Sequence, residues 1–331
     1  MEVLMHFMGI ACGVAILVKS ADWFTGAAVE IARRFKVPEI IVGATLVSLA
    51  TTMPEFAVSL IAALQGQVAR TVGNALGSTI CNTGLILGLC ALLAAMGVDR
   101  KGFLPNGLSL LVFAAIFGAM AYAFPDGSTM VGVVMLLCLV VFLTRTVRAS
   151  LRGQSEEEEV RAAQQAVATV RRMVLLFAGG AVGIVAGSKL TVYCAENLAR
   201  RVGISELVIS LTLLALGTSL PELVVSVAGI IKKQRALAIG NIIGANILNL
   251  AWVIGACSLV RPLPLQKSEH WGHQIRQSLV FDIPVMLTLS GLLLIFGLTG
   301  KRLSRAEGAV LLAIYIAYVA ITYSVFGRAA V

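Results

Sequence analysis

The chain carries little charge. Charged residues make up 13% of its 331 residues, whereas a typical soluble domain has about 25%. Apolar residues make up 58%, and the mean hydropathy is +0.93. A single soluble core does not bury so much apolar sequence, which argues against a soluble protein. We therefore expect a polytopic membrane protein whose solvent is the lipid bilayer.

Three further features of the sequence reduce the number of possible functions. None of the six cysteines forms a CxxC or other metal-ligand spacing, so we interpret them as small packing residues. The apolar N-terminus lacks a basic n-region and a clean cleavage site, which favours a first membrane helix over a signal peptide. The net charge of +9 comes from basic residues in loops, a pattern of membrane topology and not of nucleic-acid binding.

Apolar windows of about 20 residues predict transmembrane helices. We expect an all-α membrane protein with ten spans, the first and sixth continuing as amphipathic helices toward Lys36 and Gly203. The predicted spans are 3–20, 39–64, 71–97, 104–123, 128–145, 172–192, 205–231, 236–260, 279–298 and 305–326.

One sizeable polar stretch, residues 146–171, separates residues 1–145 from residues 172–331, and we interpret it as a cytoplasmic linker. Lysine and arginine number 17 in the odd-numbered connections, against 8 in the even-numbered connections and the C-terminus. Because basic loops stay on the cytoplasmic side, both termini are predicted to lie outside a plasma or bacterial inner membrane.

The chain also contains an internal repeat. A shift of 167 residues places residues 50–55 (ATTMPE) on residues 217–222 (GTSLPE). The same register continues without a gap over about 75 residues and aligns Gly73-Asn74 with Gly240-Asn241, Gly77 with Gly244 and Asn82 with Asn249. Each copy holds five predicted spans, so the second enters the membrane from the opposite side. Such inverted repeats are typical of secondary transporters, with the site at the midplane.

Each repeat places one carboxylate, Glu55 or Glu222, within an apolar span. A carboxylate at bilayer depth is costly and usually marks an ion or proton path. The alternative is a structural ion pair, but no basic residue lies in the central part of any predicted span. Pro54 and Pro221 precede the glutamates, and a proline loosens the carbonyl four residues back from the helix ladder.

Further oxygen atoms surround each glutamate in the pattern. Helical spacing puts a threonine, Thr51 or Thr218, on the same face as its glutamate. Thr52 and Ser219 add hydroxyls close to that face, and Asn82 and Asn249 offer amide oxygens or interhelical hydrogen bonds. An all-oxygen set suits Ca²⁺ or Na⁺ and argues against zinc or copper. Two carboxylates neutralise one Ca²⁺ or two Na⁺, so the same cavity can accept either in turn.

These motifs resemble those of the calcium/cation antiporter superfamily, and most closely the prokaryotic sodium/calcium exchangers. That family's pattern is G-[TS]-S-x-P-E followed by G-N-x-x-G-S-N. Residues 217–222 match the first part in full, residues 50–55 match it closely, and residues 73–78 and 240–245 match the second. The resemblance covers both halves of the chain. It implies a secondary active antiporter that exchanges Ca²⁺ for Na⁺ by alternating access, with no covalently bound cofactor.

The resemblance also implies residue roles. Glu55 and Glu222 would bind Ca²⁺ with the main-chain oxygens of Thr51 and Thr218, and the first and sixth helices would slide past the rest. Flanking Na⁺ sites would use Ser48, Thr51, Thr52, Ser78, Ala215 (main chain), Thr218 and Ser219, with Asn82 and Asn249 beside the central site. We expect Ca²⁺, Na⁺ and lipid as partners, no nucleic acid, and a functional monomer.

The sequence departs from the family pattern at Ala245, where a serine is expected, and at Asn249, where many members carry aspartate; the change to Thr52 is mild. These departures leave open a cation exchanger coupled to H⁺ or K⁺. Two alternatives from other classes also stay open. A cation channel usually needs a continuous pore, often built by several subunits. An intramembrane enzyme could use two carboxylates for acid–base chemistry, but the hydroxyl and amide ligands would then have no role.

Overall fold

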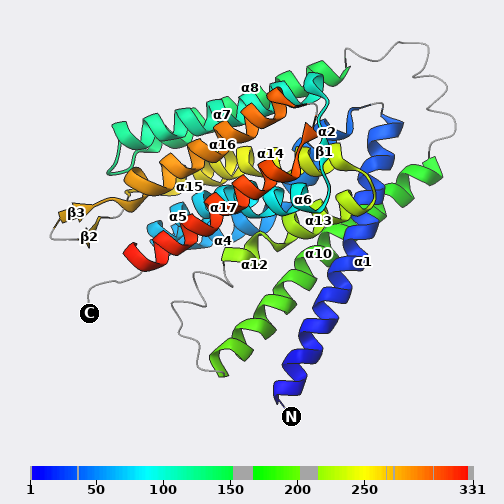
Figure 1. Cartoon of the computed structure of the whole chain (residues 1–331), viewed down its shortest axis with the longest axis horizontal. Helices are drawn as coiled ribbons and strands as arrows, with labels where there is room; N and C mark the ends of the chain where they lie inside the picture. Colours follow the sequence, from blue (N-terminus) through cyan, green and yellow to red (C-terminus); the bar gives the residue numbers. More distant parts are fainter. Residues whose placement is uncertain are drawn as a thin grey trace. The chain divides into compact units, whose positions relative to one another are not determined.

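The structure is a computed structural model, and it describes residues 2–35, 37–151, 167–201, 215–265, 267–270, 273–300 and 302–326. Nearly all of this part is helical (Figure 1). Its contacts define two compact units. The first unit comprises Met1–Thr51 and Leu143–Asn241, and the second comprises Thr52–Phe142 and Ile242–Val331. Each unit combines segments from both sequence repeats.

The first unit is built around two long helices, α1 (Glu2–Arg34) and α10 (Val167–Arg201). Its remaining elements are short: α2 (Glu39–Val42), the π-helix η1 (Gly43–Val47), α3 (Ser48–Thr51), the end of α8 (Thr129–Leu151), α12 (Ala215–Thr218), α13 (Leu220–Ile231) and the first turns of α14 (Arg235–Leu248).

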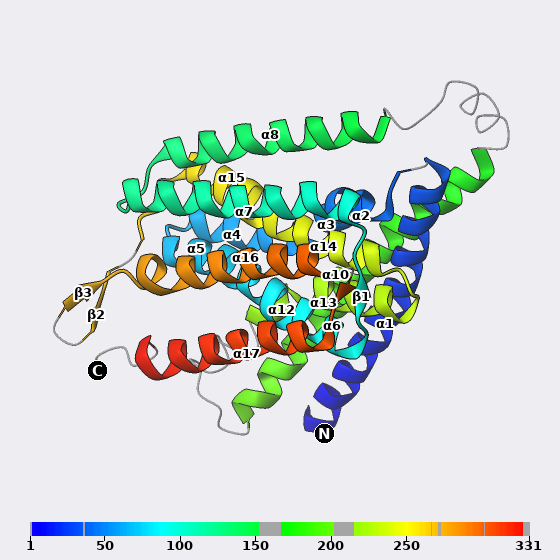
Figure 2. The same ribbon diagram turned by 45° about the horizontal axis from the view of Figure 1, so that its top comes forward.

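Helices α1 and α10 run side by side because glycines line the face between them (Figures 1 and 2). A Cβ atom on Gly187 would lie 2.9 Å from the carbonyl oxygen of Gly13, and one on Gly180 would lie 2.9 Å from Phe24. Small residues let membrane helices approach this closely. At the far end of α13, Lys232 forms a 2.6 Å ion pair with Asp22 of α1.

The second unit holds most of the remaining spans and two short strand pairs, β1 with β4 and β2 with β3. Its elements are α4 (Met53–Leu64), α5 (Val68–Cys81), η2 (Asn82–Leu87), α6 (Gly88–Leu93), β1 (Met96–Gly97), α7 (Arg100–Ala123), most of α8 (Thr129–Leu151), the end of α14, η4 (Asn249–Val253), α15 (Ile254–Val260), β2 (Ser268–His270), β3 (His273–Ile275), η5 (Ser278–Asp282), α16 (Ile283–Thr299), β4 (Arg302–Leu303), α17 (Arg305–Ile321) and η6 (Thr322–Phe326).

Close helix contacts also organise the second unit. Helix α16 packs along α7 (Figure 1), and α17 packs against α6 and η2 (Figure 2). A Cβ atom on Gly88 would lie 3.0 Å from the carbonyl oxygen of Gly308, which explains why both positions lack a side chain. Helix α17 begins with a capping box in which Ser304 and Glu307 satisfy each other's main-chain N–H groups.

The number of membrane spans in the structure agrees only in part with the ten that we predicted. Among the described residues, eight helices are long and apolar enough to cross a membrane, and a ninth span results if Glu39–Thr51 and Met53–Leu64 are counted together. Of the seventh predicted span, 205–231, residues 205–214 lie outside the described part and α13 is a short apolar helix. The continuation of the first and sixth spans is confirmed as far as Arg34 and Arg201.

One predicted boundary is wrong. The span 71–97 ends as a helix at Leu93, because the backbone becomes extended at Ala94 and residues 96–97 pair with β4. The cytoplasmic linker 146–171 stays a prediction; α8 continues into it to Leu151, and α10 begins within it at Val167. Residues 152–166 lie outside the described part.

Candidate cation site

Both repeats interrupt a helix at the same position. Thr52 separates α3 from α4 with φ −80° and ψ −6°, and Ser219 separates α12 from α13 with φ −90° and ψ 6°. The prolines that follow, Pro54 and Pro221, are the second residues of α4 and α13. A proline has no N–H to donate to the preceding turn, which accounts for the interruption before each glutamate.

The prolines were predicted to free main-chain carbonyls near Ala50 and Gly217. In the first unit, the Gly217 carbonyl accepts a 3.0 Å hydrogen bond from the Ser188 hydroxyl of α10. This bond replaces the one that Pro221, which has no N–H, cannot donate to Gly217. A carbonyl oxygen has two lone pairs, so one remains for another partner.

The first-unit cluster consists of the candidate residues Ser48, Thr51, Ala215, Thr218, Ser219 and Glu222. Glu222 is 0% exposed on α13, and α13 contacts α3, which carries Ser48 and Thr51, and α12, which carries Ala215 and Thr218. The Thr51 hydroxyl lies 3.2 Å from Oδ1 of Asn241 and 3.3 Å from the Ser48 carbonyl. Thr51 thus links the broken helix to α14, a partner to which the sequence pattern gave no role.

The second-unit cluster consists of Thr52, Glu55, Ser78, Asn82 and Asn249. Glu55 is 0% exposed on α4, which contacts both α5 and η4. The amide nitrogen of Asn74 donates to the Glu55 carbonyl at 3.2 Å and to the Ser59 hydroxyl at 2.9 Å. Phe56 stacks on Trp252 with a ring separation of 4.1 Å. These contacts fix α4 against its neighbours directly beside the carboxylate.

The two candidate asparagines each begin a π-helix, Asn82 in η2 and Asn249 in η4. Single π-turns within α-helices are frequent at functional sites. Asn82 donates through Nδ2 to Oδ1 of Asn246 at 3.1 Å, so the interhelical hydrogen bond considered from the sequence is present. Its Oδ1, and both side-chain polar atoms of Asn249, are buried with no hydrogen-bond partner among the described residues.

The chemistry of both clusters is that of oxygen ligands. In the described part of the chain, no group of three or more His, Cys, Asp or Glu side chains could hold a metal ion. The hydroxyl oxygens of Thr52 and Ser219 are buried and have no hydrogen-bond partner among the described residues. Buried polar atoms are normally hydrogen-bonded, so such unsatisfied oxygens are candidates for contact with an ion.

The glycines of the repeated Gly-Asn-x-x-Gly motif behave differently in the two copies. A Cβ atom on Gly240 would lie 2.2 Å from the carbonyl oxygen of Ile40, so close helix approach is confirmed there. At Gly73 and Gly77 a Cβ atom would meet nothing within 4 Å in the described structure. Close packing therefore does not explain the first copy of the motif.

The sequence-based site also missed three buried polar residues. Asn241 and Asn246 lie on α14, and a signal for both was present in the repeated motif, where Asn246 precedes Asn249 by three residues. Asp282 is buried in η5 and accepts 3.2 Å hydrogen bonds from Tyr318 and Gln277. Asp282 lies near the end of a predicted span, where an acidic residue is expected to be exposed, so the sequence did not predict its burial.

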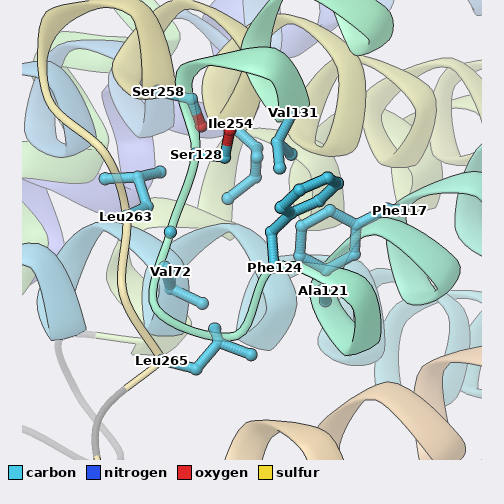
Figure 3. A pocket seen from close by; sticks show the side chains of 11 residues that line it. Val72, Phe117, Ala121, Phe124, Ser128, Val131, Ile254, Ser258, Leu263 and Leu265 are labelled. Atoms are coloured by element: carbon cyan, nitrogen blue, oxygen red, sulfur yellow. The ribbon is translucent and has the colours of Figure 1, made fainter.

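A pocket in the second unit has none of the candidate ligands in its lining (Figure 3). Its lining is almost wholly apolar, and its two hydroxyls come from Ser128 and Ser258. The residues that line it are Val72, Phe117, Ala121, Phe124, Gly127, Ser128, Val131, Ile254, Ser258, Leu263 and Leu265. It offers no carboxylate, so we do not assign it to ion binding.

Comparison with known proteins gives consistent relatives. The family described as sodium/calcium exchanger protein matches residues 5–148 and 172–324. The sodium/calcium exchanger MaX1 of Methanosarcina acetivorans is 30% identical over 97% of this chain and 99% of its own length. The putative antiporter CaxA of Alkalimonas amylolytica is 34% identical over 95% and 98%. A solved structure of the sodium-calcium exchanger NCX_Mj, soaked with Na⁺ and Sr²⁺, superimposes with a TM-score of 0.83 at 31% identity, covering 96% of this chain and 99% of that one.

Proposed function

Since the chain belongs to the sodium/calcium exchanger protein family, we propose that it is a secondary antiporter that exchanges Ca²⁺ for Na⁺ across a membrane. Its relatives are transporters and not enzymes, so an intramembrane enzyme is set aside. One observation carries the proposal: each repeat places a fully buried glutamate three residues after a helix break.

The transported cation would be held by oxygen atoms from both repeats. Glu55 and Glu222 together supply a charge of −2, which balances one Ca²⁺ or two Na⁺. The remaining ligands of the proposal are Thr51 and Thr218 through their main-chain oxygens, Ser48, Thr52, Ser78, Ala215 and Ser219 at the Na⁺ positions, and Asn82 and Asn249 beside the centre.

The architecture that suits this function is ten transmembrane helices in two inverted five-helix repeats, with the site at the midplane. Alternating access would arise from movement of α1 and α10, whose glycine contacts favour motion of the pair as one body. We propose a monomer in a plasma or bacterial inner membrane, with both termini outside. The excess of basic residues in the odd-numbered connections supports this orientation.

A second candidate keeps the fold but couples Ca²⁺ to H⁺ or K⁺. It is favoured by Ala245, which lacks the hydroxyl of the family pattern, and by Asn249, which lacks its carboxylate. A cation channel is the candidate from another class. It would conduct down a gradient without coupling and without saturable counterflow.

The test is uptake of ⁴⁵Ca²⁺ into proteoliposomes loaded with Na⁺ and diluted into medium without Na⁺. We expect uptake that depends on the outward Na⁺ gradient and collapses when the Na⁺ gradient is removed. Parallel vesicles with an imposed K⁺ or pH gradient distinguish the coupling ions. Uptake that follows a pH or K⁺ gradient alone would reject sodium coupling, and uptake that needs no counter-ion would favour a channel.

A further inference from the structure

A short chain of hydrogen bonds ends at Asn82, and all of its members lie in the second unit. The Thr83 hydroxyl lies 3.1 Å from the Thr79 carbonyl. The amide nitrogen of Asn246 lies 2.7 Å from that hydroxyl, and the amide oxygen of Asn246 lies 3.1 Å from Nδ2 of Asn82. Asn82, Thr83 and Asn246 are all buried.

The first member of this chain determines the direction of every other bond. A main-chain carbonyl can only accept, so the single hydroxyl hydrogen of Thr83 is used for Thr79. The Thr83 oxygen must then accept, and Asn246 must donate to it through its amide group. Asn246 consequently presents its oxygen to Asn82, which can meet it only with a donor, its own amide group.

The consequence is that Asn82 cannot exchange its amide nitrogen and oxygen without breaking a buried hydrogen bond. Its Oδ1 stays free for another partner, since it is buried and has no hydrogen-bond partner in the described structure. This polarity matters because a cation is bound by an amide oxygen and repelled by the amide hydrogens. In general, groups behind a metal ligand orient it and affect affinity nearly as much as the ligand itself.

We propose that Asn246 is a positioning residue for the transported cation: with Thr83 behind it, Asn246 holds the Asn82 side chain with its oxygen toward the ion. This inference rests on the proposed function, in which Asn82 lies beside the central Ca²⁺. Asn246 itself does not contact the ion.

The second repeat lacks this arrangement. The position equivalent to Asn246 is Thr79, whose hydroxyl donates to the Ala75 carbonyl of its own helix at 2.8 Å. Asn249, the equivalent of Asn82, has no hydrogen-bond partner for either side-chain atom among the described residues. The hydrogen-bond chain, which joins Thr79, Asn82 and Thr83 of the first repeat to Asn246 of the second, therefore orients Asn82 and has no counterpart at Asn249 among the described residues.

The test compares Ca²⁺ affinity in full-length variants, measured by ⁴⁵Ca²⁺ binding to the purified protein. We expect Asn246→Leu to raise the half-saturating Ca²⁺ concentration about tenfold, as is usual when a group behind a metal ligand is lost. Thr83→Val, which keeps the side-chain size, should raise it less, about threefold, because it removes one neutral hydrogen bond and leaves the bond between Asn246 and Asn82. The matched control is Asn106→Leu, which removes a buried amide whose hydrogen bond in the described structure is to its own helix, at the Gly102 carbonyl. This control should bind Ca²⁺ as the wild type does.

An Asn82→Asp background separates positioning from packing. Aspartate offers an oxygen in either orientation, so Asn246→Leu should weaken Ca²⁺ binding much less there than in the wild-type background. An equal loss in both backgrounds would overturn the inference, because it would show a packing defect. If Asn246→Leu does not fold, Thr83→Val in the same two backgrounds decides the question.

The outcome also distinguishes this inference from the proposed function. If Asn82→Ala weakens Ca²⁺ binding but Asn246→Leu and Thr83→Val do not, the positioning role is wrong and the cation site stands. If Asn82→Ala leaves Ca²⁺ binding unchanged, the assignment of Asn82 as a ligand is wrong, and the positioning role falls with it.

Discussion

Asn82 and Asn249 occupy equivalent positions 167 residues apart, both buried and both at the start of a π-helix, yet their surroundings differ. Asn82 is held by Asn246, whereas Asn249 has no hydrogen-bond partner among the described residues. The difference comes from two positions: Asn246 and Thr83 hold Asn82, and their equivalents in the other repeat are Thr79 and Leu250. A duplicated motif therefore specifies the residue types of a site but not the orientation of each side chain.

A similar difference in hydrogen bonding appears at the second pair of equivalent asparagines, Asn74 and Asn241. Asn74 bonds to the Glu55 carbonyl and the Ser59 hydroxyl. Its equivalent, Asn241, accepts a hydrogen bond from Thr51, while its own Nδ2 and the Ser226 hydroxyl are buried without a hydrogen-bond partner in the described structure. The glutamates, by contrast, are alike in burial and in their position after a helix break. We expect the carboxylates to behave alike and the asparagines to behave differently.

The largest expected effect is the loss of either carboxylate. Glu55→Gln and Glu222→Gln should each weaken Ca²⁺ binding at least about 100-fold, because the affinity of an oxygen site depends strongly on its number of charged ligands. Gradient-driven ⁴⁵Ca²⁺ uptake should be abolished in both. Glu30→Gln, at an exposed glutamate of α1, is the matched control and should transport normally. Retained uptake in only one of the two variants would contradict the equivalence of the glutamates.

A smaller effect should separate the two candidate amides. Asn82→Ala removes an oriented ligand and should raise the half-saturating Ca²⁺ concentration about tenfold. Asn249→Ala should raise it only about threefold. No hydrogen bond holds the Asn249 side chain in the described structure, so part of its binding energy is spent on ordering it when the ion binds. Equilibrium binding of ⁴⁵Ca²⁺ measures both. Equal losses would show that orientation by Asn246 does not matter for affinity.

The other pair of asparagines should differ in stability. Asn74→Ala removes two hydrogen bonds between α4 and α5 and should destabilise the protein by about 1–3 kcal/mol. Asn241→Ala removes one acceptor and should cost about 1 kcal/mol or less. Thermal unfolding in detergent with a Ca²⁺ chelator measures both without a contribution from ion binding. A greater loss for Asn241→Ala would reverse this part of the comparison.

The smallest expected effect concerns the counter-ion. Ala245→Ser restores the hydroxyl of the family pattern and should lower the half-activating Na⁺ concentration about threefold, the low end of what a neutral hydrogen-bonding oxygen contributes (about 0.5–1.5 kcal/mol). The Na⁺ dependence of ⁴⁵Ca²⁺ release from loaded vesicles measures this. No change in Na⁺ dependence, together with a response to pH or K⁺, would favour the alternative coupling ions.

Much of this arrangement was predictable from the sequence because membrane helices and repeats leave strong local signals. Low charge, apolar windows and the 167-residue shift predicted the helical membrane protein and the equivalence of Glu55 and Glu222. Pro54 and Pro221 predicted the helix breaks, since the effect of proline on a helix is local.

What the sequence did not reveal depends on contacts between distant segments. The bond between Asn82 and Asn246 joins residues 164 positions apart, and the one between Thr51 and Asn241 joins residues 190 apart. Periodicity assigns a residue to a helix face but does not identify its partner on another helix. The end of the third predicted span was also missed, because pairing of β1 with β4 overrides the apolar pattern at residues 94–97.

The central claim is that Glu55 and Glu222 serve one common cation site. Its most direct test is the number of Ca²⁺ ions bound per chain at equilibrium in the wild type and in the two single glutamine variants. We predict that the wild type binds one high-affinity Ca²⁺ per chain, which Na⁺ displaces. Glu55→Gln and Glu222→Gln should bind none with high affinity. Two Ca²⁺ ions per chain, of which each variant loses one and keeps the other, would contradict it.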